Sequence, residues 1–182
     1  MGLFRKLFSK KEEITTNNIN EVLNLGEYFY FMTYEEHYQE FLNGLTNKNK
    51  VISELFVFRG WTTQLGFRIF SSKPDISERI IGEIFNQGKL GKKLLAQLEH
   101  VDIEKETGEE YIDLVDNRWQ IYDAEFINNK TDENPIPTLK ICSKLSDFCN
   151  INDPLKLALI SIDFFKHLDK IKDDAIKCGL FK

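Results

Sequence analysis

The amino-acid sequence predicts an all-α protein: a single-domain bundle of about seven to eight helices around a central apolar helix at residues 51–70. Prolines and glycines are few, four and ten in 182 residues, which leaves room for long uninterrupted elements. Apolar side chains recur at helical spacing through most of the chain. Hydrophobic residues make up 42% of it and include 15 Phe, enough for a core built from large rings.

Helix start and stop signals place the elements in order along the chain. The expected helices cover residues 19–31, 34–45, 50–71, 76–87, 92–100, 109–128, 137–149 and 153–177. The last of these begins with Pro154 at its first helical position, where the missing amide hydrogen costs nothing. Residues 101–112 leave a choice, because this segment also fits a short hairpin that turns at Thr107 and Gly108.

The N-terminal segment, residues 1–11, differs in character from the helical domain expected over residues 12–182. It holds four basic residues and no acid, and its apolar residues Leu3, Phe4, Leu7 and Phe8 follow helical spacing. Such a segment either docks on its own domain or makes a weak contact with a membrane surface. No apolar run reaches the roughly 20 residues that span a bilayer, and no secretory signal is present, so we expect a cytoplasmic protein.

Two arginines stand in the central helix, whose apolar side chains point almost all the way round. Arg59 and Arg68 have no acidic residue three or four positions away, and their nine-residue separation directs them to opposite sides. Because an unpaired buried charge costs several kcal/mol, each is expected to reach a carboxylate on another helix. We interpret both as structural charge clasps. Gly66, on the same face as Arg59, allows a neighbouring helix or a ligand to approach closely.

The cysteines and histidines form no recognisable metal site. Cys142, Cys149 and Cys178 lack a CxxC pair, and the first two, seven residues apart on one helix face, fit small core residues. The histidines stand apart in the chain, each near an acid, and no HExxH motif occurs: His37, His100 and His167. We therefore expect no metal, no cofactor and no catalytic residue. A metal-dependent helical enzyme that uses these histidines is the alternative.

Charge is the strongest functional signal. The net charge is −5, and four of the 24 basic residues lie in the N-terminal segment, which leaves 20 against 29 acids in the remaining chain. An acidic body disfavours nucleic-acid binding and suits a basic partner. Residues 99–125 hold ten acids against two bases. The predicted partner-binding residues in this stretch are Glu104, Glu106, Glu109, Glu110, Asp113, Asp116 and Asp123.

These observations favour a non-enzymatic cytoplasmic binding protein whose acidic face meets a basic protein. A toxin-neutralising immunity protein is one concrete form of it, suggested by small size, acidity and the lack of catalytic motifs. Two alternatives are the metal-dependent helical enzyme and a peripheral membrane adaptor that uses the N-terminal segment.

Overall fold

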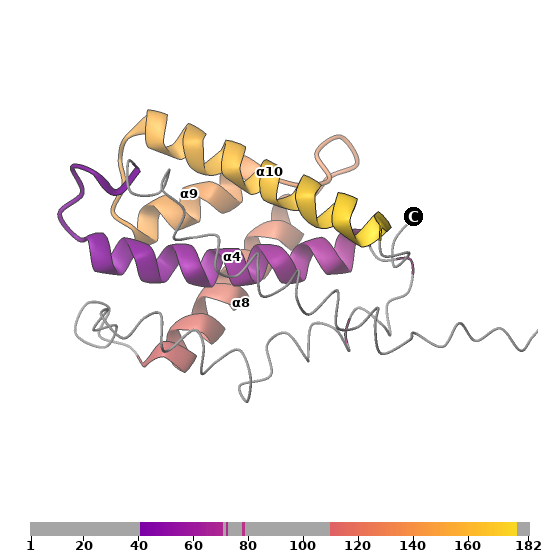
Figure 1. The fold of residues 1–182 in the computed structure, drawn as a ribbon, viewed down its shortest axis with the longest axis horizontal. Coiled ribbons are helices and arrows are strands. Elements are labelled where there is room, and N and C mark those ends of the chain that lie inside the picture. Colours follow the sequence, from indigo (N-terminus) through magenta and orange to yellow (C-terminus); the bar gives the residue numbers. More distant parts are fainter. Residues whose placement is uncertain (1–40, 71, 73–77, 79–109, 178–182) are drawn as a thin grey trace, which may run out of the picture.

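The structure, a computed structural model, describes residues 41–70, 72, 78 and 110–177. Within this part of the chain, four α-helices pack into a bundle and no strand is present (Figure 1). They are α4 (Lys48–Phe70), α8 (Tyr111–Asn129), α9 (Thr138–Phe148) and α10 (Pro154–Lys177). The all-α prediction is therefore confirmed for the described residues.

The four helices agree closely with the predicted segments. The central helix begins two residues earlier than expected, and α10 begins at Pro154 as predicted. Because α8 begins at Tyr111, residues 111–112 are helical and do not form the end of a hairpin. The helices expected at 19–31 and 92–100, most of those at 34–45 and 76–87, and residues 101–109 lie outside the described residues, as does the boundary between the segments 1–11 and 12–182.

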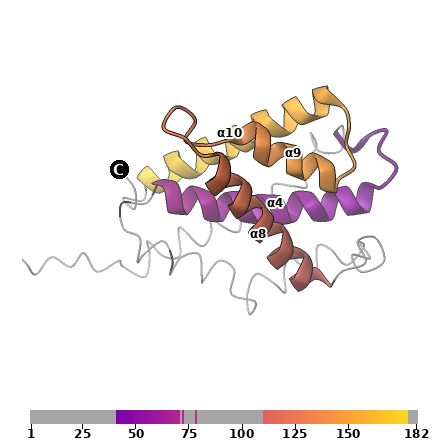
Figure 2. The same ribbon diagram turned by 180° about the vertical axis from the view of Figure 1, so that it is seen from behind.

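Helix α4 occupies the centre of the bundle. It contacts α8, α9 and α10, and α10 lies along its length while α8 crosses it on another side (Figures 1 and 2). Fifteen of its 23 residues are buried, which matches a helix whose apolar side chains point in most directions. Its neighbours cover it from several sides, so the prediction of a central apolar helix is confirmed.

Large aromatic rings form the middle of this core. The ring of Phe58 lies 5.2 Å from that of Tyr122 and 5.6 Å from that of Phe164, centroid to centroid. Trp61 stands beside all three rings and is almost completely buried. These rings come from α4, α8 and α10, so edge and stacked contacts between them join three helices.

A glycine sets the spacing between α4 and α10. A Cβ atom added at Gly66 would lie 3.0 Å from both Cδ1 and Cγ2 of Ile171, which is closer than side chains normally pack. The glycine therefore permits α10 to approach the backbone of α4 at this point, as its position in the sequence predicted.

The cysteines of α9 belong to the core. Cys142 and Cys149 are buried free thiols, as expected from their spacing. Burial raises the pKa of Cys142 to about 12 and raises that of Cys149 further, so both remain protonated and unreactive. Cys178 lies outside the described residues. None of the described helices has the length and apolar character required to cross a bilayer.

Candidate functional site

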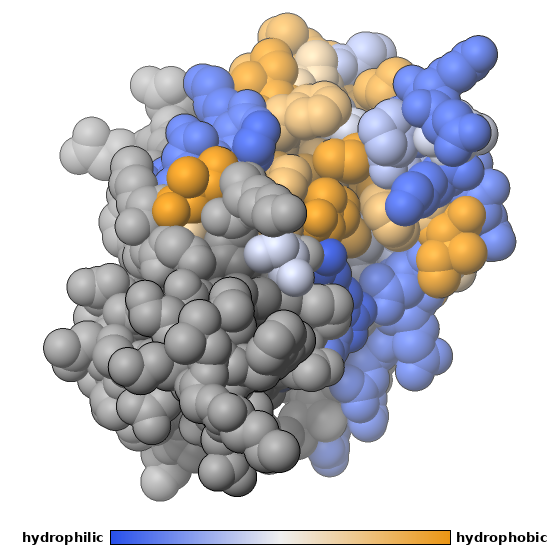
Figure 3. Space-filling view, turned by 90° about the vertical axis from the view of Figure 1, so that its right-hand side faces the viewer, coloured by the Kyte–Doolittle hydropathy of each residue, from blue (hydrophilic) through white to orange (hydrophobic). Residues whose placement is uncertain are grey.

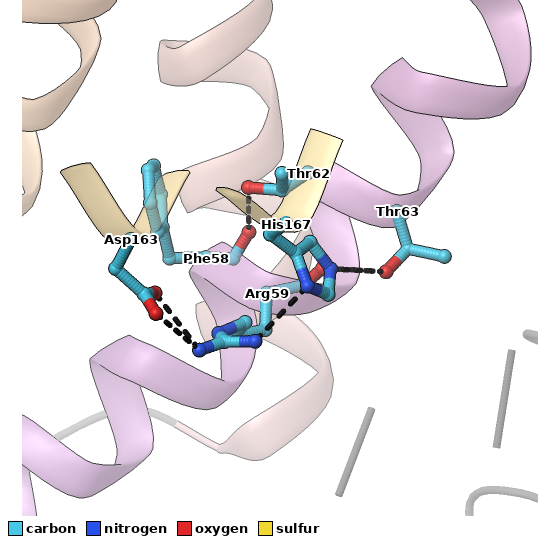
Figure 4. Close-up of polar contacts among 6 residues, drawn as sticks. All are labelled: Phe58, Arg59, Thr62, Thr63, Asp163 and His167. Carbon is cyan, nitrogen blue, oxygen red and sulfur yellow. Dashed lines mark hydrogen bonds and ion pairs between the residues drawn. The ribbon is translucent and has the colours of Figure 1, made fainter. Parts of the chain in front are cut away.

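Arg59 lies at the centre of a buried polar network between α4 and α10 (Figure 4). Its side chain is only 3% exposed. Its Nη2 donates hydrogen bonds to both carboxylate oxygens of Asp163, at 2.9 and 2.8 Å, and its Nη1 lies 3.0 Å from Nδ1 of His167. Asp163 and His167 are four residues apart in α10, so both side chains point to the same face of that helix.

The hydrogen bonds of this network define the proton positions on His167. A guanidinium group can only donate, so Nδ1 must accept from Arg59 and the ring proton must reside on Nε2. Nε2 then donates to the hydroxyl of Thr63 at 3.2 Å, and that hydroxyl donates to the backbone carbonyl of Arg59 at 2.9 Å. Burial, and secondarily the charge of Arg59, hold the pKa of His167 well below its ordinary value of 6.5. The imidazole is neutral.

This geometry bears on the histidine-based enzyme alternative. Both ring nitrogens of His167 are used in hydrogen bonds inside the bundle, and the ring is buried. In this arrangement it presents no lone pair to a metal ion. Among the described residues no group of three potential metal ligands occurs. His37 and His100 lie outside those residues.

A second buried ion pair joins α4 to α8. Glu54 is completely buried and receives three hydrogen bonds from Arg118, two from Nε and one from Nη2, at 2.9 to 3.1 Å. The guanidinium also lies over the ring of Phe148 on α9, 4.1 Å from its centroid. The sequence did not predict a partner for Glu54. An acid surrounded by apolar residues on a core helix was the available signal.

Arg68 is paired as expected but is more exposed than expected. Its Nε donates to Glu78 at 3.2 Å, and its Nη1 lies 4.0 Å from Asp123 on α8. It therefore has carboxylate partners as predicted, but 41% of the side chain is exposed, so the predicted desolvation is wrong. Arg68 lies in the last turn of α4, where Ile69 is also 36% exposed.

The acidic stretch divides into inward and outward residues on α8. Asp123 accepts a hydrogen bond from the indole Nε1 of Trp61 at 2.8 Å, and Glu125 lies 3.5 Å from Lys144 of α9. In contrast, Glu110, Asp113 and Asp116 are exposed. Of the described residues, none forms an ion pair with these three. Glu104, Glu106 and Glu109 lie outside the described residues.

Asp113 and Asp116 lie on one face of α8, and Glu110, the residue before its first turn, is exposed at the N-terminal end. This face continues along the helix through Asn117, Gln120, Ala124 and Ile127, all of them exposed. It contains no basic side chain, because Arg118 turns inward to Glu54. We call the residues Glu110, Asp113 and Asp116 the acidic face. Comparison of the chain with protein-family models, curated proteins and solved structures finds no match.

Proposed function

We propose that this chain is a binding protein whose acidic face on α8 docks a basic protein. The observation that carries the proposal is the division of charge on α8. Asp123 and Glu125 contact Trp61 and Lys144 on neighbouring helices, while Glu110, Asp113 and Asp116 are exposed and form no ion pair with the described residues. Carboxylates placed in this way create a negative potential that attracts a cationic surface.

The physical effect of such a face is greatest on association. Exposed charges at the edge of an interface steer two proteins together and suppress encounters with acidic proteins, and they contribute less to holding the complex. Acids near a helix N-terminus also stabilise the helix through its dipole, by about 0.3–1 kcal/mol each. That intramolecular role affects folding alone, so binding kinetics separate the two roles.

A toxin-neutralising immunity protein is the concrete form that we propose. The small size and acidity of the chain support it. Both ring nitrogens of His167 are engaged in hydrogen bonds within the bundle, which fits a structural role for this histidine. The corresponding partner is a basic toxin domain, held through an interface in which α8 contributes the steering charges.

The proposal is tested by charge reversal. The full chain is used to isolate a partner from the native host, and association rates are then measured for the wild type and for the variant Glu110→Lys, Asp113→Lys, Asp116→Lys. We expect the association rate to fall roughly tenfold or more and its salt dependence to weaken. The dissociation rate should change less, and circular dichroism should report an intact fold.

A matched control distinguishes the effect of the acidic face on the association rate from the effect of net charge alone. The variant Asp132→Lys, Glu133→Lys, Asp173→Lys makes the same change in charge at exposed positions away from this face. It should associate at close to the wild-type rate. If both variants are slowed equally, only overall charge matters. If neither is slowed, the acidic face is not the binding site.

A further inference from the structure

The hydrogen bonds of Asp163 and His167 join α10 to α4. Arg59 donates to both residues, and the hydroxyl of Thr63 accepts from Nε2 of His167. In Figure 4 the side chains of Asp163 and His167 both reach from α10 toward residues of α4. A change in the protonation of this network therefore acts on the contact between these two helices.

The groups around His167 disfavour a second proton on its ring. From α4, Arg59 directs an N–H toward Nδ1 at 3.0 Å, and its charge acts on the imidazole. On α10, Asp163 already accepts two hydrogen bonds from Arg59, and Lys170 is a further cation three residues after His167. From α9, which also packs on α10, the buried thiol of Cys142 is protonated and uncharged. A proton on Nδ1 would point at the guanidinium and turn an attraction into a repulsion.

The first half of α10 is held by a polar contact of a different kind. Lys156 donates from Nζ to the backbone carbonyl oxygens of Phe41 and Asn43, at 2.7 and 3.1 Å, which ties this half to the segment before α4. A backbone carbonyl does not titrate and an ammonium group already carries its proton, so acid leaves this contact unchanged. The acid-sensitive group lies further along, in residues 163–177, which we call the C-terminal half of α10.

The C-terminal half of α10 has one side in solvent and one side in the bundle. Lys172, Asp173 and Ile176 are exposed. Figure 3 views the molecule from the end where α10 finishes and shows hydrophilic and hydrophobic residues at that surface. On the inner side Leu168 and Ile171 are buried. These apolar contacts keep the closed arrangement dominant, so uptake of a proton changes the population of a minor open form.

We propose that the C-terminal half of α10 separates from α4 when His167 takes up a proton, while α8 and the first half of α10 stay in place. Separation moves Nδ1 away from Arg59 and brings the ring into water, where it can hold two protons. The open form therefore binds a proton that the closed form excludes. Below about pH 6.5 acid raises the open population, by at most about tenfold per pH unit for one proton. The fold thus contains a pH-sensitive segment, whose opening uncovers α4 around Arg59 and Gly66.

The test is native-state hydrogen exchange on the full chain, measured by mass spectrometry between about pH 7.5 and about pH 5 and at low urea concentrations. After correction for the intrinsic exchange rate at each pH, the open population of residues 163–177 should rise by up to about tenfold per pH unit. It should depend weakly on urea, because a small surface is exposed, whereas the amides of α8 should respond strongly. Residues 163–177 that exchange no faster than α8, with the same urea dependence, would show global unfolding alone and overturn the proposal. An open population that does not change with pH would also overturn it.

A pair of histidine variants assigns the proton. His167→Gln should remove most of the acid response of residues 163–177, because an amide does not titrate. His100→Gln is the matched control, another histidine of the same chain changed in the same way, and it should keep the response. A response that persists in His167→Gln, or that His100→Gln removes, would contradict the assignment to His167.

Nuclear magnetic resonance of the imidazole nitrogens checks the closed form in the wild type. At about pH 7.5 His167 should be neutral, with its proton on Nε2. A proton on Nδ1 would contradict the contact with Arg59 on which the proposal rests. The acidic face takes no part in these measurements, so their outcome is independent of the function proposed above.

Discussion

The two sides of α4 hold buried charges of opposite sign, and each charge is paired in a different way. Toward α8, Glu54 is completely buried and meets Arg118, whose side chain is 12% exposed, in a pair of permanent charges. Toward α10, Arg59 meets Asp163, which is 31% exposed, together with the neutral ring of His167. The first side is closed to water. The second contains a group that can take up a proton and a carboxylate that water reaches.

This difference determines how each side responds to perturbation. Removing one member of a buried pair takes the opposite charge away from the other, which costs several kcal/mol. On the α10 side, water can compensate a freed Asp163, so mutation should cost less, but acid can disrupt the hydrogen bonds of His167. We therefore expect the α8 side to be the more sensitive to mutation and the α10 side to be the more sensitive to pH.

The largest effect is expected on the α8 side. Glu54→Leu should lower the free energy of unfolding by about 3–5 kcal/mol, because Arg118 loses the buried carboxylate that accepts three of its hydrogen bonds. Urea denaturation provides the measurement. In the double variant Glu54→Leu, Arg118→Met, most of that loss should be recovered, since apolar residues of similar size often replace a buried pair at little cost. A double variant as unstable as the single one would contradict the role assigned to the pair.

A smaller loss is expected at Arg59. Arg59→Met removes the ion pair to Asp163 and the hydrogen bond to His167. The free energy of unfolding should fall by about 3 kcal/mol, the lower end for a buried pair, because Asp163 can be hydrated. The same urea experiment compares it directly with Glu54→Leu. A loss equal to or above that of Glu54→Leu would reverse the order of the two sides.

The α10 side should also produce a pH dependence of stability. Since the pKa of His167 is lowered in the folded chain, the unfolded chain binds an additional proton as the pH falls below the ordinary value of 6.5. Stability is therefore full above pH 6.5 and decreases with acid, by at most about 1.4 kcal/mol per pH unit for one proton.

Denaturation measured between about pH 7.5 and about pH 5, the range that brackets the ordinary titration of histidine, gives this slope. The control is His167→Gln, whose amide can accept from Arg59 and donate to Thr63 without titrating. It should show a shallower slope than the wild type. Equal slopes in the two proteins would mean that other groups cause the acid sensitivity.

The smallest effect is expected at Arg68, which was predicted from the sequence to behave like Arg59. Its pairs with Glu78 and Asp123 are exposed, and such pairs contribute about 0–1 kcal/mol. Arg68→Ala should therefore change the free energy of unfolding by no more than about 1 kcal/mol. Salt should reduce the difference further. A loss comparable to that of Arg59→Met would show that exposure is a poor guide to the strength of these clasps.

The positions of the helices were determined by the sequence alone, because their signals are local. The apolar periodicity of α4 and α8 and Pro154 at the start of α10 depend on residues near one another in the chain. The same periodicity placed Cys142 and Cys149 on one helix face. Each of these features needs only the geometry of one helix.

The partners and exposure of the charges were decided only by the tertiary structure. Arg59 meets Asp163 at a separation of 104 residues, and Glu54 meets Arg118 at 64. Arg59 and Arg68 stand on the same apolar helix, yet Arg59 faces α10 and is 3% exposed, whereas Arg68 points to another side and is 41% exposed. Likewise, Asp123 turns toward Trp61 while Asp113 and Asp116 face outward. Burial depends on which helices cross and where, and the pattern within one helix does not contain that information.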